Sequence, residues 1–284
     1  MHFLDDSTTR RFDGLNRLDR TDRLLILTLL TDFGTRDYFI GAMKGAILSV
    51  NPNAQIIDLT HDVPPQDVRS AAFTLFAACQ TFPAQAIHVS VVDPGVGSNR
   101  RAIIAVADKH IFVAPDNGIL SFVYAQSKHL QVFEITNSAF FRERVSATFH
   151  GRDVFAPVAG ALSLGIAPDE LGTEIFDFVR LEIARPQLTN ENTIAAEILH
   201  VDRFGNCVTN VTRDDLPQAF WSKLSRVMIN DREITEHFDF YAQAAEGEIF
   251  TIFGSADFLE IVAFKDSAAN LLKIKSGQAL EIKF

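Results

Sequence analysis

Apolar residues in the first 166 or so positions form short continuous runs that alternate with longer segments of helical spacing. A continuous run is typical of a strand buried on both faces, whereas apolar residues three or four positions apart mark one face of a helix. The runs predict strands at 24–30, 56–59, 87–92, 102–107 and 111–114. The spaced segments predict helices at 37–50, 67–82, 119–126 and 153–164. This alternation predicts a layered α/β domain with a mostly parallel or mixed sheet, in which 102–107 and 111–114 form a hairpin.

Beyond the polar stretch at 186–192 the pattern changes to short apolar runs separated by turn residues. Helical spacing is nearly absent, and runs of this length are typical of a small antiparallel β domain. They lie at 194–201, 208–211, 226–229, 249–253, 259–264 and 279–282. The sequence therefore predicts two domains, an α/β domain over 24–185 and a smaller β-rich C-terminal domain over 186–284.

Residues 1–23 interleave arginine with aspartate, which makes this segment too acidic for a transit peptide and too polar for a core. We predict a solvated, flexible N-terminal extension. The segment lacks the charged, apolar and small-residue order of a signal peptide, and no apolar run approaches the length of a membrane span. We therefore expect a soluble protein with no membrane partner.

The formal net charge of −10 over 284 residues disfavours a nucleic-acid partner, because phosphate contacts need a clustered basic surface. Small or cationic ligands fit this charge better. Cys79 and Cys207 are the only cysteines and lie far apart, so no disulfide framework or cysteine zinc site is predicted. This cysteine usage favours a reducing, cytoplasmic location.

Three polar clusters stand where apolar runs end, which is where α/β proteins usually place their sites. The run at 87–92 stops at Asp93. A glycine loop follows and ends at two arginines, Arg100 and Arg101. An aspartate that faces an arginine across a loop can also be a structural ion pair that braces a turn, and this alternative stays open. The other two clusters are Thr-Asp-Phe-Gly at 31–34 and Phe-His-Gly-Arg-Asp at 149–153.

These clusters, together with Pro-Asp-Asn-Gly at 115–118 and Phe-Gly-Asn at 204–206, resemble the motifs of the S-adenosyl-L-methionine hydroxide adenosyltransferases, or SAM hydrolases. That family is related to fluorinase and chlorinase, which attack the same substrate with halide. The resemblance covers residues 24–284. It implies hydrolysis of S-adenosyl-L-methionine to adenosine and L-methionine, by attack of an activated water on C5′ of the ribose. It also implies a homotrimer without a cofactor, in which the C-terminal domain of one subunit completes the substrate site of the next.

The resemblance assigns the activation of water to Asp93, Arg100 and His150. Bulk water has a pKa of about 15.7, so a positioned base and a nearby positive charge must favour hydroxide. Which of Asp93 and His150 is the formal base stays open. The sulfonium departs as a neutral methionine thioether, so the reaction requires no metal, and no metal cluster is recognisable in the sequence.

The resemblance also implies contacts to the rest of the substrate. Asp32 matches the carboxylate that accepts both ribose hydroxyls, although a plain turn aspartate before Gly34 is the alternative. Asn206 matches the asparagine that reads adenine. The positions that resemble contacts to the methionine amino and carboxyl groups are Asp202, Ser255 and Asp37.

Three further features bear on how far the resemblance extends. Asn117 is a further candidate for substrate binding, but turn formation explains an asparagine in its loop equally well. The segment 264–266 replaces a turn that contains asparagine in the family, so the contacts made there stay open. Gly151 stands where halide users carry serine, which favours water as the nucleophile.

Two other functions fit parts of the pattern. A protein that binds S-adenosylmethionine or adenosine without turnover needs Asp32 and Asn206, but it has no need of three residues that activate water. A phosphate site in the glycine loop at 94–99 is disfavoured, because the glycine spacing matches neither common phosphate-binding motif and Asp93 repels phosphate.

Overall fold

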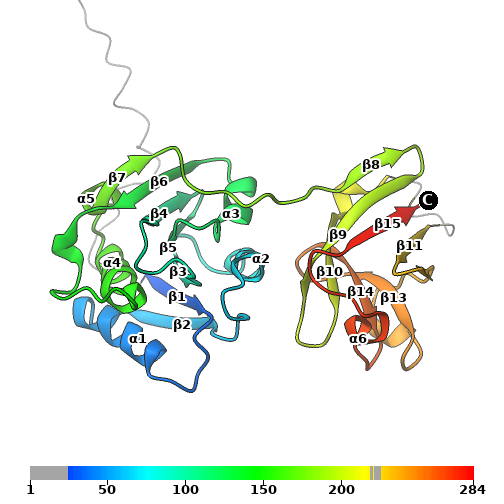
Figure 1. Ribbon diagram of the computed structural model, residues 1–284, viewed down its shortest axis with the longest axis horizontal. Helices are drawn as coiled ribbons and strands as arrows, with labels where there is room; N and C mark the ends of the chain where they lie inside the picture. Colours follow the sequence, from blue (N-terminus) through cyan, green and yellow to red (C-terminus); the bar gives the residue numbers. More distant parts are fainter. Residues whose placement is uncertain (1–24, 218–219, 221–224) are drawn as a thin grey trace, which may run out of the picture. The chain divides into compact units, whose positions relative to one another are not determined.

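The computed structural model describes residues 25–217, 220 and 225–284, which divide into two compact units (Figure 1). The first unit contains residues 25–62, 83–115 and 128–177, and the second contains residues 63–82, 116–127 and 178–284. The domain boundary near residue 185 stays a prediction. The predicted extension at 1–23 lies outside the described residues.

A seven-stranded mixed sheet forms the first unit. In sheet order its strands are β2 (Gln55–Thr60), β1 (Ile26–Thr31), β3 (Ile87–Val91), β5 (His110–Pro115), β4 (Ala102–Ala107), β6 (Leu130–Ile135) and β7 (Gly172–Ile175). The first four strands are parallel to one another, whereas the pairs β5–β4, β4–β6 and β6–β7 are antiparallel. Burial along nearly all of β1 and β3 explains their continuous apolar sequences. The predicted mixed sheet and hairpin are confirmed, whereas β6 and β7 have no predicted counterpart.

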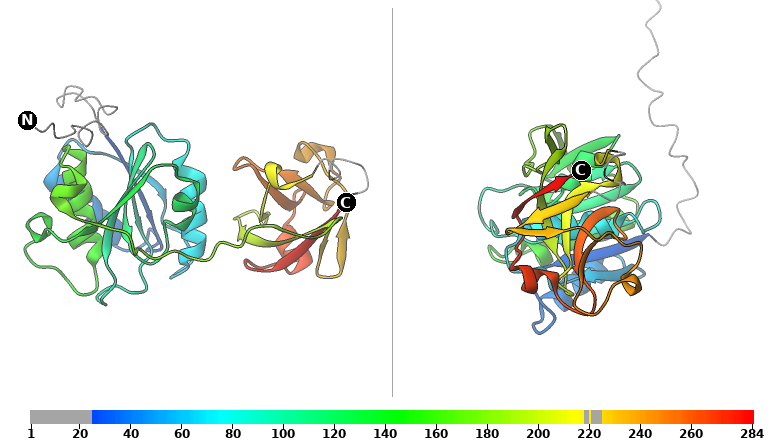
Figure 2. Two further views of the ribbon diagram at one scale, coloured as in Figure 1. Left: turned by 90° about the horizontal axis from the view of Figure 1, so that it is seen from above. Right: turned by 90° about the vertical axis from the view of Figure 1, so that its right-hand side faces the viewer.

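Two helices, α1 (Phe39–Val50) and α4 (Ala156–Ser163), pack against this sheet through one apolar core (Figure 2). Gly160 lets the two helices approach closely, since a Cβ there would lie 2.8 Å from the Cβ of Val50. A π-helical turn, η2 (Gly151–Phe155), leads directly into α4, so the helix predicted at 153–164 begins with a wider turn. The remaining short helices are η1 (Ser138–Phe140) and α5 (Pro168–Leu171).

An eight-stranded antiparallel sheet forms most of the second unit, as predicted for the C-terminal part of the chain. Its strands are β8 (Gln187–Asn190), β9 (Thr193–Val201), β10 (Cys207–Thr212), β11 (Arg226–Ile229), β12 (Arg232–Ile234), β13 (Ile249–Phe253), β14 (Phe258–Ala263) and β15 (Ala279–Lys283). Helices of this unit are α2 (Val68–Cys79), α3 (Ser121–Gln126), α6 (Ala268–Leu272), η3 (Arg213–Asp215) and η5 (Tyr241–Gln243). Phe73 and Phe122 of the first two helices form an apolar cluster with Leu199 and Phe258.

Across the described ranges, no helix has both the length and the apolar character needed to cross a membrane.

Candidate active site

The carboxyl ends of β1 and β3 place two of the predicted site residues at one edge of the first sheet. Thr31 pairs with Val91 in the parallel ladder. Asp32 follows Thr31 directly, and Asp93 lies two residues beyond Val91. The ends of adjacent parallel strands thus bring both aspartates to the same edge, as ligand sites of α/β sheets require.

Asp93 and Arg100 form a bidentate ion pair across the glycine loop. The Arg100 Nε donates to Oδ1 of Asp93 at 2.9 Å, and Nη2 donates to Oδ2 at 2.5 Å. Only 5% of the Asp93 side chain and 9% of the Arg100 side chain are exposed. Such a fork fixes the direction of both groups, and burial protects the pair from screening.

His150 completes a hydrogen-bonded chain with this pair. Nη2 of Arg100 lies 2.9 Å from Nδ1 of His150. A guanidinium can only donate, so Nδ1 accepts, and the proton of the neutral imidazole lies on Nε2. Burial, followed by the charge of Arg100, lowers the pKa of His150 below its ordinary value, despite the opposing charges of Asp93 and Asp153. We therefore assign His150 as a neutral ring at physiological pH.

Aromatic rings lie beside the hydrogen-bonded group of Asp93, Arg100 and His150. The guanidinium of Arg100 lies 5.1 Å from the ring centroid of Phe155, which is fully buried. Phe149 precedes His150 and packs edge-on against Phe39, with centroids 5.2 Å apart. Phe33, in the loop that follows Asp32, packs against Phe149 at 6.0 Å.

Asp153 anchors the segment that supports the glycine loop. Its fully buried carboxylate accepts from Nε of Arg152 at 2.6 Å and from the backbone N–H of Ser146 at 2.8 Å. Burial opposes its ionisation, but these hydrogen bonds lower its pKa overall. Gly97 has φ +78°, and a Cβ there would clash with the carbonyl oxygen of Ala147. Asp153 was within a predicted cluster, yet its anchoring role became visible only in the structure.

The loop that carries Asp32 is held by His61. Nδ1 of His61 lies 2.9 Å from Oγ1 of Thr31, and the carbonyl oxygen of His61 accepts from the N–H of Gly34 at 2.8 Å. Asp32 is half-buried in this fixed loop, whereas Asp37 is exposed ahead of α1. The contact of Asp32 to the ribose stays a prediction.

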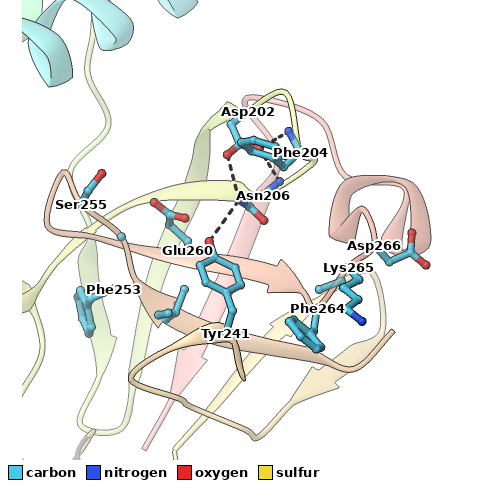
Figure 3. A pocket seen from close by; sticks show the side chains of 13 residues that line it. Asp202, Phe204, Asn206, Tyr241, Phe253, Ser255, Glu260, Phe264, Lys265 and Asp266 are labelled. Carbon is cyan, nitrogen blue, oxygen red and sulfur yellow. Dashed lines mark hydrogen bonds between the residues drawn. The ribbon is translucent and has the colours of Figure 1, made fainter. Parts of the chain in front are cut away.

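A separate cavity of about 830 Å³ in the second unit contains three other predicted site residues, Asp202, Asn206 and Ser255 (Figure 3). Sequence reasoning missed Tyr241 and Glu260, which line the same cavity. The remaining lining residues are Phe204, Ile252, Phe253, Gly254, Ala263, Phe264, Lys265 and Asp266, so the divergent turn at 264–266 also borders it.

Asp202 organises the β9–β10 turn on one side of this cavity. Its Oδ1 accepts from the N–H groups of Phe204 and Asn206, both at 2.8 Å, and its Oδ2 accepts from Nδ2 of Asn206 at 2.9 Å. Nδ2 of Asn206 also lies 3.3 Å from the hydroxyl of Tyr241. Both amide hydrogens of Asn206 are thus engaged, and Oδ1 remains to accept from a ligand.

Glu260 is another carboxyl group of this cavity. Burial, and then the charge of Asp202, raises its pKa to about 7. The side chain lies over Gly254, where any Cβ would clash with it. Its position in β14 gives no signal of a site in the sequence, because an acidic residue in a strand usually faces solvent.

Asn117 lies in the second unit and forms a local turn. Its Oδ1 accepts from the N–H of Ile119 at 3.2 Å. This contact is of the kind that the turn-forming alternative predicts. Among the described residues, no group of three or more histidines, cysteines, aspartates and glutamates is arranged to hold a metal ion.

Comparison with known proteins gives matches over most of the chain. Residues 27–172 match the model of the SAM hydroxide adenosyltransferase N-terminal domain, and residues 196–281 match the C-terminal domain of the same family. A protein of Salinispora arenicola named (R)-S-adenosyl-L-methionine hydrolase is 36% identical, over 90% of this chain and 97% of that protein. A fluorinase of Nocardia brasiliensis is 27% identical, over 67% of this chain and 72% of that enzyme.

A solved structure from Thermotoga maritima is similar throughout. It superposes with a TM-score of 0.86 at 34% identity, and the match covers 91% of this chain and 100% of that structure. The fold and the two domain matches define an α/β protein with a C-terminal β domain, as the sequence predicts. The chain belongs to the SAM hydroxide adenosyltransferase family.

Proposed function

We propose that this protein hydrolyses S-adenosyl-L-methionine to adenosine and L-methionine, by attack of an activated water on C5′ of the ribose. The observation that carries the proposal is the hydrogen-bonded chain of Asp93, Arg100 and His150 at the end of β3. Membership of the family and the relatives named as hydrolases support the same reaction. Incubation with substrate followed by product analysis tests it, and binding without product formation would favour a non-catalytic binding protein.

The tautomer of His150 favours Asp93 as the group that accepts the proton of water. Nδ1 of His150 is occupied by Arg100, and Nε2 carries the proton of the neutral ring. His150 can therefore orient the water by donating to it, but it has no free acceptor nitrogen. A carboxylate has about four acceptor positions, so Asp93 keeps capacity for a water beside its bonds to Arg100. Arg100 supplies the positive charge that favours hydroxide.

Reaction in heavy-oxygen water should place the label on C5′ of adenosine and leave methionine unlabelled. The nucleophile attacks carbon, and the sulfonium departs with both electrons of the broken C–S bond as a neutral thioether. Mass spectrometry of both products measures the label. We also expect full turnover in the presence of a chelator; loss of activity that added metal restores, or label in methionine, would contradict the proposed reaction.

Asp32→Ala should weaken binding of S-adenosylmethionine at least tenfold, because the ribose hydroxyls lose a charged acceptor. Hydrogen bonds to charged groups contribute roughly 1.5–3 kcal/mol each. Calorimetry on the folded variant measures the change in affinity. Asp62→Ala is the control, because Asp62 is an exposed aspartate in the loop after β2 of the same unit. Unchanged affinity would reduce Asp32 to a turn residue.

We further propose a cytoplasmic homotrimer, in which the C-terminal domain of one subunit completes the substrate site of the next. The family resemblance supports the trimer, and two buried cysteines that form no disulfide are consistent with a reducing compartment. Light scattering of the purified protein measures the assembly mass, and a monomeric mass with full activity would contradict shared sites.

A further inference from the structure

The loop between β1 and α1 carries Asp32 and has no regular secondary structure of its own. Two hydrogen bonds tie its backbone to residues outside the loop. The N–H of Gly34 donates to the carbonyl oxygen of His61 at 2.8 Å. The N–H of Phe33 donates to Oγ1 of Thr31 at 3.2 Å. The two residues that follow Asp32 are therefore held by His61 and by Thr31.

Parallel pairing of β1 with β2 brings Thr31 and His61 together where the two strands end (Figure 1). Leu30 pairs with Thr60 after a shift of register, so the next residue along each strand is Thr31 or His61. Oγ1 of Thr31 lies 2.9 Å from Nδ1 of His61, and the two residues are only 0% and 4% exposed. Burial makes this hydrogen bond costly to break, because water cannot replace either partner.

Asp58 sets the direction of this hydrogen bond. Its Oδ1 lies 3.1 Å from Nε2 of His61, in a contact that is not aligned as a regular hydrogen bond, and its Oδ2 accepts from Nζ of Lys44 at 2.7 Å. Burial opposes ionisation of Asp58, but the contacts with Lys44 and His61 lower its pKa overall. In the neutral ring, a negative charge beside Nε2 favours the proton on that nitrogen. Nδ1 then accepts from the hydroxyl of Thr31.

We propose that His61 is a positioning residue for recognition of the ribose by Asp32. Its ring holds the residue before that aspartate, and its carbonyl oxygen holds the loop after it. A carboxylate that accepts from two neighbouring hydroxyls must be aimed within a limited range of angles, so a loosened loop weakens this contact first. The inference rests on the proposed function, since the hydroxyls are those of the ribose of S-adenosylmethionine.

Adenosine and 2′,3′-dideoxyadenosine measure this contact, because they differ only in the two ribose hydroxyls. Calorimetry with both nucleosides gives the ratio of their dissociation constants for each protein. The wild-type protein should bind adenosine at least tenfold more tightly, since Asp32 accepts from both hydroxyls. A residue that only stabilises the fold would change the melting temperature and leave this ratio at its wild-type value.

Two amide variants separate the two nitrogens of the His61 ring. The amide of His61→Asn takes the position of Nδ1 and can still accept from Thr31, whereas the amide of His61→Gln takes the position of Nε2 and cannot. His61→Gln should lower the ratio about three- to tenfold, which corresponds to one lost hydrogen bond. His61→Asn should stay within about twofold of the wild type. A folded His61→Gln protein with the wild-type ratio would overturn the proposal.

Thr31→Val and Thr31→Ser test the same hydrogen bond from its other end. Valine has the shape of threonine without the hydroxyl, so the ratio should fall about as far as in His61→Gln, and serine should preserve it. Equal losses in the two variants would overturn the role of the hydroxyl. Lys44→Gln is the matched control, because it removes a partly exposed partner of Asp58 and leaves the contact with His61. Its ratio should stay within about twofold of the wild type, as for other surface ion pairs.

The tautomer of His61 can be measured in the wild-type protein, even if a variant fails to fold. Two-bond nitrogen–proton correlation spectra of histidine-labelled protein show which ring nitrogen carries the proton, and a proton on Nδ1 would overturn the inferred direction. A wild-type protein that hydrolyses S-adenosylmethionine but binds both nucleosides equally would overturn this inference and leave the proposed function intact. Absence of both hydrolysis and adenosine binding would instead overturn the proposed function.

Discussion

Asp93→Asn should slow the hydrolysis of S-adenosylmethionine by about 10²–10⁴-fold, the usual contribution of a positioned base. The amide keeps the shape of the side chain and one acceptor for Arg100, but it loses the charge that accepts the proton of water. Substrate affinity should change little, because the residue acts on the nucleophile. Single-turnover rates, affinity and melting temperature measured on the same preparation separate these effects.

Asp177→Asn is the matched control for this variant. Asp177 pairs with Arg101 at 2.7 Å, but its side chain is 80% exposed. The same chemical change therefore removes a charge from an arginine pair at the surface, where such pairs contribute little. Turnover should stay within about twofold of the wild type. An Asp93→Asn protein that is folded and equally fast would leave the pair with only the role of bracing a turn.

Arg100→Ala should destabilise the protein by roughly 3–5 kcal/mol, because it leaves the carboxylate of Asp93 buried without its partner. Turnover should fall as well, since the positive charge beside the water is lost. Denaturant unfolding measures the first effect, and single-turnover kinetics at low temperature measures the second.

The double variant Asp93→Asn, Arg100→Ala tests the physical reason for this loss. It contains no unpaired charge at the site, so part of the stability lost in Arg100→Ala should return. Its turnover should be far less impaired than the product of the two single effects, because the residues act as one unit. Loss of stability in Arg100→Ala below about 0.5 kcal/mol, the range of ordinary surface changes, would contradict the buried-pair interpretation.

The elements that sequence reasoning found are those whose burial leaves a pattern. β3 is buried at every position, so its apolar run is visible, whereas every residue of β8 is exposed and its sequence resembles a loop. β7 and β12 are short, and each has only one or two residues that face a core. Strands of this kind are defined by their neighbours in the sheet, which a single sequence does not display.

The site residues also divide into those whose pairing the sequence reveals and those that only the fold brings together. Asp93 and Arg100 lie seven residues apart across one loop, so their pairing could be inferred from the sequence. Glu260 meets Asp202 only because β14 pairs with β10, which places residues far apart in the chain around one cavity. The tautomer of His150 likewise depends on a contact between residues 100 and 150 that only the fold specifies.

The π-helical turn beside His150 makes the local chain length part of the active-site geometry. In η2 the N–H of Ala156 bonds to the carbonyl oxygen of Gly151, five residues back, so the turn contains one residue more than an α-helical turn. Removal of that residue would allow a regular helix but would rotate everything before it by about 100° about the helix axis. His150 would then turn away from Arg100 although every catalytic side chain was retained. In natural variants, an insertion or deletion within residues 151–155 should therefore indicate loss of function as reliably as a substitution of a catalytic residue.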